Sequence, residues 1–171
     1  MGHRLKRPLN VAERYILYGL VGFACEVCFT ATFEVAIAGN RKLIGVTSVY
    51  VFFVYATAIL VIERIYLRIS KILPYLPLRA LIYTLVCYFW EFSSGFMLKR
   101  VDACPWDYSS YFDYHFMGLI TFEYLPLWFV ATMFGERLVV RKALSLAFLV
   151  EEQTFEDVAR AELLDTDVHQ D

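Results

Sequence analysis

Four long apolar segments, separated by short charged connectors, dominate the sequence. Each segment is about 20 residues long and contains few ionisable side chains, which is the length an α-helix needs to cross the hydrocarbon core of a bilayer. The expected spans are residues 15–37, 46–66, 78–98 and 116–138. The pattern therefore predicts an all-α, polytopic membrane protein, a bundle of four transmembrane helices without internal repeats.

The composition supports a membrane protein over a soluble one. Hydrophobic residues make up 59% of the 171 positions and charged residues 20%, whereas an average soluble domain has about 45–50% and about 25%. Twelve of the sixteen Lys and Arg residues lie before the first span, between the second and third, or after the fourth, when the three basic residues at the adjoining span ends are included: Arg64, Arg79 and Arg137. Because basic loops stay in the cytoplasm, both termini are expected on the cytoplasmic side.

The chain is expected to form one membrane domain with two cytoplasmic extensions. Residues 1–14 form a basic N-terminal segment, residues 15–142 contain the four spans, and residues 143–171 form an acidic tail. From residue 151 onward the tail has eight acidic residues and one arginine, a composition typical of a solvated segment.

Carboxylates inside apolar segments are the main indication of function. An ionised carboxylate in hydrocarbon costs several kcal/mol, so these acids are expected to face one another, water or a partner. The candidate pocket contains acids from the spans together with two residues from the third connector and its edge: Glu26, Glu34, Glu91, Asp107, Glu123 and His115. Glu63 is treated separately, as an interfacial anchor or ion pair beside Arg64 at the cytoplasmic end of the second span.

Polar stripes along two spans indicate which helix faces meet. The stripes recur at spacings of three and four, which place their members on one helix face: Gly19, Gly22, Glu26, Thr30 and Glu34 in the first span, and Thr84, Cys87, Tyr88, Glu91 and Gly95 in the third. Small and polar residues favour helix–helix contact in membranes. Both stripes are therefore expected to face the bundle interior, and Pro126 is expected to loosen the fourth helix beside Glu123.

The third connector, Val101 to Tyr111, offers two interpretations. Its aromatic residues Trp106 and Tyr108 suit the membrane interface, or the loop folds back as a lid over the carboxylates and brings Asp107 into the site. Three roles for the acids stay open: hydrogen bonds that hold the bundle together, a route for protons or cations, and catalysis by a lipid-modifying enzyme that uses Glu91, Glu123 and His115.

No motif indicates a cofactor, a metal or a nucleotide site. The phosphate-binding loop and the dinucleotide fingerprint do not occur in the sequence, and Cys25 and Cys28 lack a second pair of ligands at metal-binding spacing. Nucleic acid is not expected as a partner. The expected partner is the lipid bilayer, with a protein partner or an oligomer as a further option.

Several blocks of the chain closely resemble the transmembrane protein 229 family, over about Tyr15 to Arg141. The blocks are Gly45-Val-Thr-Ser-Val49, Glu63-Arg-Ile-Tyr-Leu-Arg68, Trp90-Glu-Phe92, Gly95-Phe96, Cys104-Pro-Trp-Asp-Tyr-Ser109 and Gly118-Leu-Ile-Thr-Phe-Glu-Tyr124. The similarity is greatest to the short B-type member. That family is similar in turn to bacterial membrane proteins described as type IV ABC-transporter permeases, which share the Trp-Asp-Tyr-Ser loop. The resemblance implies a multi-pass membrane protein and brings no established reaction or substrate.

Overall fold

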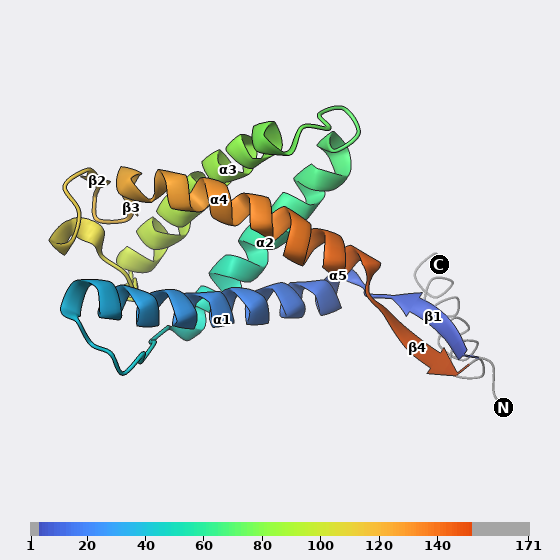
Figure 1. Ribbon diagram of the computed structural model, residues 1–171, viewed down its shortest axis with the longest axis horizontal. Helices are drawn as coiled ribbons and strands as arrows, with labels where there is room; N and C mark the ends of the chain where they lie inside the picture. Colours follow the sequence, from blue (N-terminus) through green and yellow to red (C-terminus); the bar gives the residue numbers. More distant parts are fainter. Residues whose placement is uncertain (1–3, 152–171) are drawn as a thin grey trace, which may run out of the picture.

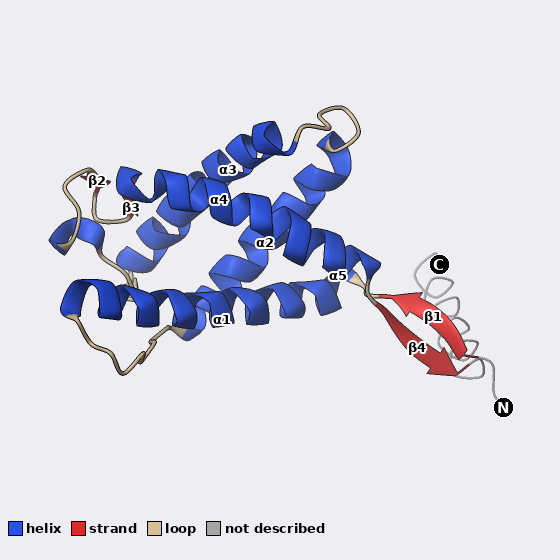
Figure 2. Ribbon diagram, viewed as in Figure 1, coloured by secondary structure: helices blue, strands red, loops and turns tan. Residues whose placement is uncertain are grey.

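The computed structural model describes residues 4–151 and is mostly helical (Figures 1 and 2). Its long helical segments are α1 (Val11–Ala38), α2 (Val49–Ile69), α3 (Leu76–Lys99) and a fourth that begins with α4 (Leu125–Phe134). Most of the predicted acidic tail, residues 152–171, lies outside the described residues.

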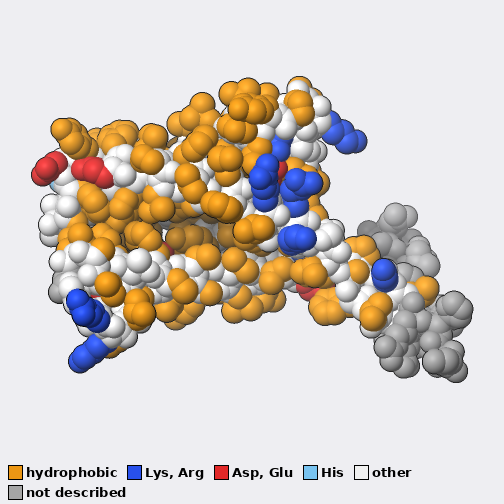
Figure 3. Space-filling model, viewed as in Figure 1, with side chains coloured by type: hydrophobic (Ala, Val, Ile, Leu, Met, Phe, Trp, Pro, Cys, Tyr) orange, Lys and Arg blue, Asp and Glu red, His pale blue; other side chains and the backbone are white. Residues whose placement is uncertain are grey.

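Three helices, α1, α2 and α3, are long and apolar enough to cross a membrane. Large apolar side chains point outward from them, and Leu85 and Phe89 are 63% and 73% exposed. Figure 3 shows hydrophobic side chains spread over the face of the helical region. Such exposure is costly in water and is normal against lipid. The chain is therefore a multi-pass integral membrane protein.

The fourth segment differs from the expected span at 116–138. It begins at Leu125 and runs without a break through α4, the π-helix η3 (Gly135–Val140) and α5 (Arg141–Ser145). Pro126 lies in the first turn of α4, where its missing amide costs nothing, so it starts this helix and does not loosen it. The segment is less apolar than the first three because η3 and α5 contain charged side chains.

Two short antiparallel strand pairs accompany the helices. Strand β1 (Arg4–Pro8) pairs with β4 (Ala147–Glu151), and so joins the two segments that were expected to be separate cytoplasmic extensions. In the structure the third connector extends from the end of α3 to Tyr124. Strand β2 (His115–Phe116) pairs with β3 (Ile120–Thr121) in this connector. This connector also contains two short 3-10 helices, η1 (Tyr108–Ser110) and η2 (Phe122–Tyr124).

The helices form two antiparallel hairpins. In the first, α1 packs along α2, and in the second, α3 packs along the fourth segment. A Cβ at Gly22 of α1 would overlap the Tyr55 side chain of α2, so the first hairpin needs a glycine there for its close approach. The hairpins meet where α2 packs against α3 and against η3 of the fourth segment (Figure 1).

The two hairpins are an internal repeat. The motif Arg-x3-Tyr-x-Leu-Val-x4-Glu occurs once in α1 and once in α3, with a constant offset of 65 positions: Arg14 and Arg79, Tyr18 and Tyr83, Glu26 and Glu91. The second helices share the motif Glu-Arg-x3-Arg, which begins at Glu63 in α2 and at Glu136 in η3. The expectation of a chain without internal repeats is therefore corrected.

The repeat is open on one side. Because the hairpins are equivalent, the contact between α2 and α3 has a counterpart, which would be a contact between the fourth segment and α1. Helices α2 and α3 are packed together, whereas α1 and α4 are not packed along their lengths. Figure 3 shows the surface hollowed between these two segments.

Candidate functional site

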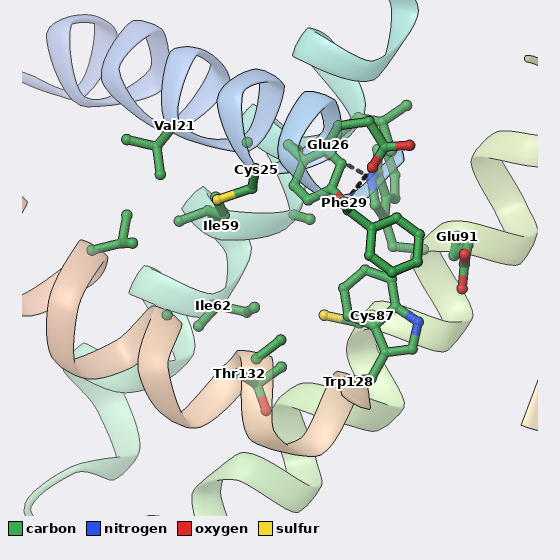
Figure 4. Close-up of a pocket in the computed structure, with 18 of the residues that line it drawn as sticks. Val21, Cys25, Glu26, Phe29, Ile59, Ile62, Cys87, Glu91, Trp128 and Thr132 are labelled. Atoms are coloured by element: carbon green, nitrogen blue, oxygen red, sulfur yellow. Dashed lines mark hydrogen bonds between the residues drawn. The ribbon is translucent and has the colours of Figure 1, made fainter. Parts of the chain in front are cut away.

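A cavity of about 470 Å³ lies between the two hairpins. Its walls come from all four helical segments and from the third connector, and they are mostly apolar. Figure 4 shows the carboxylates of Glu26 and Glu91 at the same end of the cavity, beside the rings of Phe29 and Trp128. Two of the candidate acids predicted from the sequence, one from each repeat, therefore line one cavity.

Glu26, on α1, accepts a hydrogen bond from one side chain among the described residues. The Tyr55 hydroxyl of α2 donates to its Oε2 at 2.9 Å. A tyrosine hydroxyl supplies one proton and no charge. The carboxylate of Glu26 is therefore held in place without a basic partner.

Glu91, on α3, is only half satisfied. The Tyr108 hydroxyl of η1 donates to its Oε1 at 2.7 Å, whereas its Oε2 is buried and receives no hydrogen bond of ordinary geometry from the described residues. The Trp128 indole lies close enough to interact with this carboxylate. A buried acceptor without a partner costs about 1–3 kcal/mol, and more if it is charged.

The cavity has acidic and aromatic walls and no basic residue among the described ones that line it. Glu26 and Glu91 are close enough to interact electrostatically. All three tryptophans of the chain line the cavity: Trp90, Trp106 and Trp128. The rings of Phe29, Tyr124 and Tyr108 continue the wall in successive edge-to-face contacts of 5.6 Å and 5.5 Å between centroids.

The third connector folds back over this end of the cavity. The Tyr108 amide donates to the Gly118 carbonyl at 2.8 Å, and the Trp106 indole donates to the Leu119 carbonyl at 3.1 Å. These bonds fix the two aromatic side chains that reach the cavity. The sequence placed both aromatics at the membrane interface or in a lid, and in the structure both side chains line the cavity.

Asp107 supports this loop and does not line the cavity. Its Oδ1 accepts the Ser109 amide at 2.9 Å and so caps η1. Its hydrogen bonds with Ser109 lower the pKa of the Asp107 carboxyl below its usual value. The carboxylate thus orders the turn that presents Tyr108 to Glu91.

Three other predicted site residues also lie outside the cavity lining: Glu34, Glu123 and His115. Glu34 is near the C-terminal end of α1. The exposed Glu123 accepts the Thr121 hydroxyl and the amides of Asp113 and Tyr114, which lower its pKa. The ring of His115 accepts the Gly118 amide at 3.1 Å. The structure therefore does not bring Glu91, Glu123 and His115 together in one site.

Glu63 forms a buried ion pair, one of the two roles expected for it, but its partner is not the neighbouring Arg64. Its partner is Arg14 of α1, whose Nε donates to Oε2 at 2.7 Å, and the Tyr18 hydroxyl donates to the same oxygen at 2.5 Å. The carboxylate is fully buried, so all its hydrogen bonds come from protein.

The second hairpin repeats this arrangement around Glu136, which the sequence analysis did not select. Arg79 Nε donates to Glu136 Oε2 at 2.7 Å, and the Tyr83 hydroxyl donates to the same oxygen at 2.9 Å. These residues form two triads, Arg14–Tyr18–Glu63 in the first hairpin and Arg79–Tyr83–Glu136 in the second. The repeat relates the two triads residue by residue. Comparison of the two hairpins in the sequence was the signal that could have found Glu136.

Comparison with known proteins identifies one family. Residues 14–161 match the model of the family described as "Putative ABC-transporter type IV". No solved structure matches the chain. The match supports the expected relation to bacterial transporter-type proteins, whereas the resemblance to the transmembrane protein 229 family stays a prediction. Because the match includes both hairpins and most of the chain, the protein belongs to this transporter-type family.

Proposed function

We propose that the protein is a transport-type membrane subunit that binds a ligand in the cavity between its two hairpins. The observation that carries this proposal is the buried Oε2 of Glu91, which has no well-formed hydrogen bond from the described residues, in a carboxylate that lines a cavity large enough for a small molecule. In membrane transporters built from repeats, the binding site commonly lies where the repeats meet.

The proposed topology has four crossings, with the fourth segment, residues 125–145, as the last. A continuous helix of this length extends about 30 Å, the thickness of the hydrocarbon core. Its one acid within η3, Glu136, is paired with Arg79, which removes the main cost of placing it in a membrane. Four crossings and the distribution of Lys and Arg support cytoplasmic termini.

Energy for transport would come from another source. The chain contains no phosphate-binding loop, so in an ABC-type system a separate subunit would hydrolyse ATP. The alternative role, a lipid-modifying enzyme that uses Glu91, Glu123 and His115, gains no support from the geometry, because only Glu91 lines the cavity.

Analysis of co-purified small molecules tests the proposal. The full-length protein is purified from membranes as wild type, Glu91→Gln and Glu123→Gln, and the bound compounds are extracted and compared by mass spectrometry. We expect at least one compound to be enriched with wild type and Glu123→Gln and depleted with Glu91→Gln. Identical compounds in all three preparations would count against the proposed site.

A cavity-filling variant provides a second test. A Cβ at Gly135 would meet no atom within 4 Å, and this residue lines the cavity. Its counterpart in the first hairpin is Ile62. We expect Gly135→Ile to displace the compound without altering either carboxylate, and retention of the compound would show that it binds elsewhere.

A further inference from the structure

We infer that the cavity accepts an organic ammonium ion with an apolar chain, which enters sideways from the bilayer between α1 and α4. This inference rests on the proposed ligand site and specifies the chemistry of its ligand. It depends on three features of the structure: the charge of the cavity, the nature of its walls and the position of its opening.

The charge of the cavity disfavours an anion. Glu26 and Glu91 bring two acidic groups to one end, where they accept hydrogen bonds from the hydroxyls of Tyr55 and Tyr108. No Lys, Arg or His is among the described residues that line the cavity. A third acid in the lining, Glu136, is already neutralised by Arg79. A cation would satisfy the Glu91 oxygen that lacks a well-formed hydrogen bond and would offset the repulsion between the two carboxylates.

The walls favour an organic cation over a metal ion. A hard metal ion needs about six oxygen ligands, and no group of three or more His, Cys, Asp or Glu residues capable of holding one occurs among the residues described. Aromatic faces attract ammonium groups, most strongly when tryptophan is present. Here Trp128 and Phe29 lie beside the carboxylates, as Figure 4 shows.

The shape of the site favours a cation with an apolar chain. From the carboxylates the cavity continues past Val21, Ile59 and Ile62, which provide an apolar surface. Its open side lies between α1 and α4, on a face covered by hydrophobic side chains (Figure 3). An amphiphile dissolved in the bilayer would reach the cavity with its head toward the carboxylates and its chain along this surface.

Tryptophan fluorescence measures binding directly, because every tryptophan of the chain lines the cavity. The full-length protein in nanodiscs is titrated with decyltrimethylammonium, tetramethylammonium, decyl maltoside and decyl sulfonate. The four probes separate a long cation from a short cation, a neutral amphiphile and an anionic amphiphile. Titration of Glu91→Gln corrects for probe that dissolves in the lipid, and Glu123→Gln is the matched control outside the cavity.

We expect decyltrimethylammonium to bind at least about tenfold more tightly than the neutral and anionic probes. Glu91→Gln should remove this preference, whereas Glu123→Gln should retain it. Glu26→Gln gives an independent variant if Glu91→Gln does not fold. Equal affinity for the long cation and the neutral probe would overturn the inference and leave the ligand site in place.

The remaining probes distinguish the other outcomes. Tetramethylammonium should bind more weakly than the long cation, and equal affinity of these two would overturn entry from the bilayer and indicate a water-soluble ligand. If none of the probes changes the fluorescence while co-purification also finds no compound, the proposed function itself fails.

Discussion

Glutamates inside the hairpins and glutamates between the hairpins have different bonding partners. Within the hairpins, Glu63 and Glu136 each receive a guanidinium and a tyrosine hydroxyl. Between the hairpins, Glu26 and Glu91 line the cavity, and the well-formed hydrogen bonds that they receive from the described residues come from tyrosine hydroxyls. Glu136 borders the cavity as well, but its carboxylate is already paired with Arg79. Buried charges that serve stability are normally paired. The contrast indicates that the first two acids stabilise the fold and that the second two are available to a ligand.

Glycines follow the same division. Gly22 and Gly135 both border the cavity, but an added Cβ at Gly22 would overlap Tyr55 inside the first hairpin, whereas a Cβ at Gly135 would meet open space. The hairpins are thus closely packed units, and the unfilled volume lies where they face each other. Substitutions can test this division at each type of position.

The largest effect is expected from breaking the buried ion pair of the second hairpin. Arg79→Met leaves the Glu136 carboxylate buried without its cationic partner, which should cost about 3–5 kcal/mol of unfolding free energy. Chemical denaturation of the protein in detergent measures the loss. Adding Glu136→Leu to this variant should recover most of the stability, and no recovery would mean that the pair is not the source of the loss.

A smaller loss is expected at the tight contact of the first hairpin. Gly22→Ala places a Cβ against the Tyr55 side chain, which should cost about 1–3 kcal/mol. Alanine favours a helix over glycine by about 1 kcal/mol, so the overlap should outweigh the gain in helix propensity. Thermal unfolding checks the sign, and a stabilised variant would show that α1 and α2 are not in close contact here.

The matched substitution at the cavity should have the opposite sign. Gly135→Ala gains helix propensity and meets no neighbouring atom, so it should stabilise the protein by up to about 1 kcal/mol. The same thermal measurement applies. Destabilisation comparable to that of Gly22→Ala would show that the cavity is closed at this point.

The smallest effect concerns the pH dependence of the third connector. Hydrogen bonds from Thr121 and two backbone amides hold the pKa of Glu123 below its usual value of 4.5. Its ionised form therefore stabilises the fold above pH 4.5, and this contribution is lost as the pH falls through the lowered pKa. Wild type should have a higher Tm than Glu123→Gln at pH 7, and the difference should shrink below pH 4.5. A Tm difference that does not change with pH would mean that the charge of Glu123 does not contribute to stability.

The sequence predicted the helical segments well because lipid exposure leaves long apolar runs that are easy to recognise. It was less successful at the fourth segment, since residues 116–124 are apolar enough to resemble a helix yet form a strand pair and η2. The pairing of β1 with β4 was also missed. The contact joins residues far apart in the chain, and neither strand has a distinctive pattern of its own.

For the site, the free-energy cost of placing a carboxylate in hydrocarbon identified Glu26 and Glu91 as unusual. This cost does not indicate which acids lie close together. Glu123 was grouped with them because a helix was expected around it, whereas the segment folds back and exposes this residue to backbone amides. Tyr55 and Tyr108 were not selected as partners of the acids, since tyrosine is also common at membrane interfaces. The repeat offsets contain the missing information, because they relate each acid to its counterpart.

A parallel unfolding measurement on Glu91→Gln and Glu136→Gln tests the central claim most directly, in the same detergent and at neutral pH. Glutamine preserves the shape of each side chain and removes its charge. We predict that Glu136→Gln loses about 3 kcal/mol or more, because Arg79 is left without its anion, while Glu91→Gln stays within about 1 kcal/mol of wild type or exceeds it. Equal losses at both positions would contradict the account, because Glu91 would then be as much a part of the fold as Glu136.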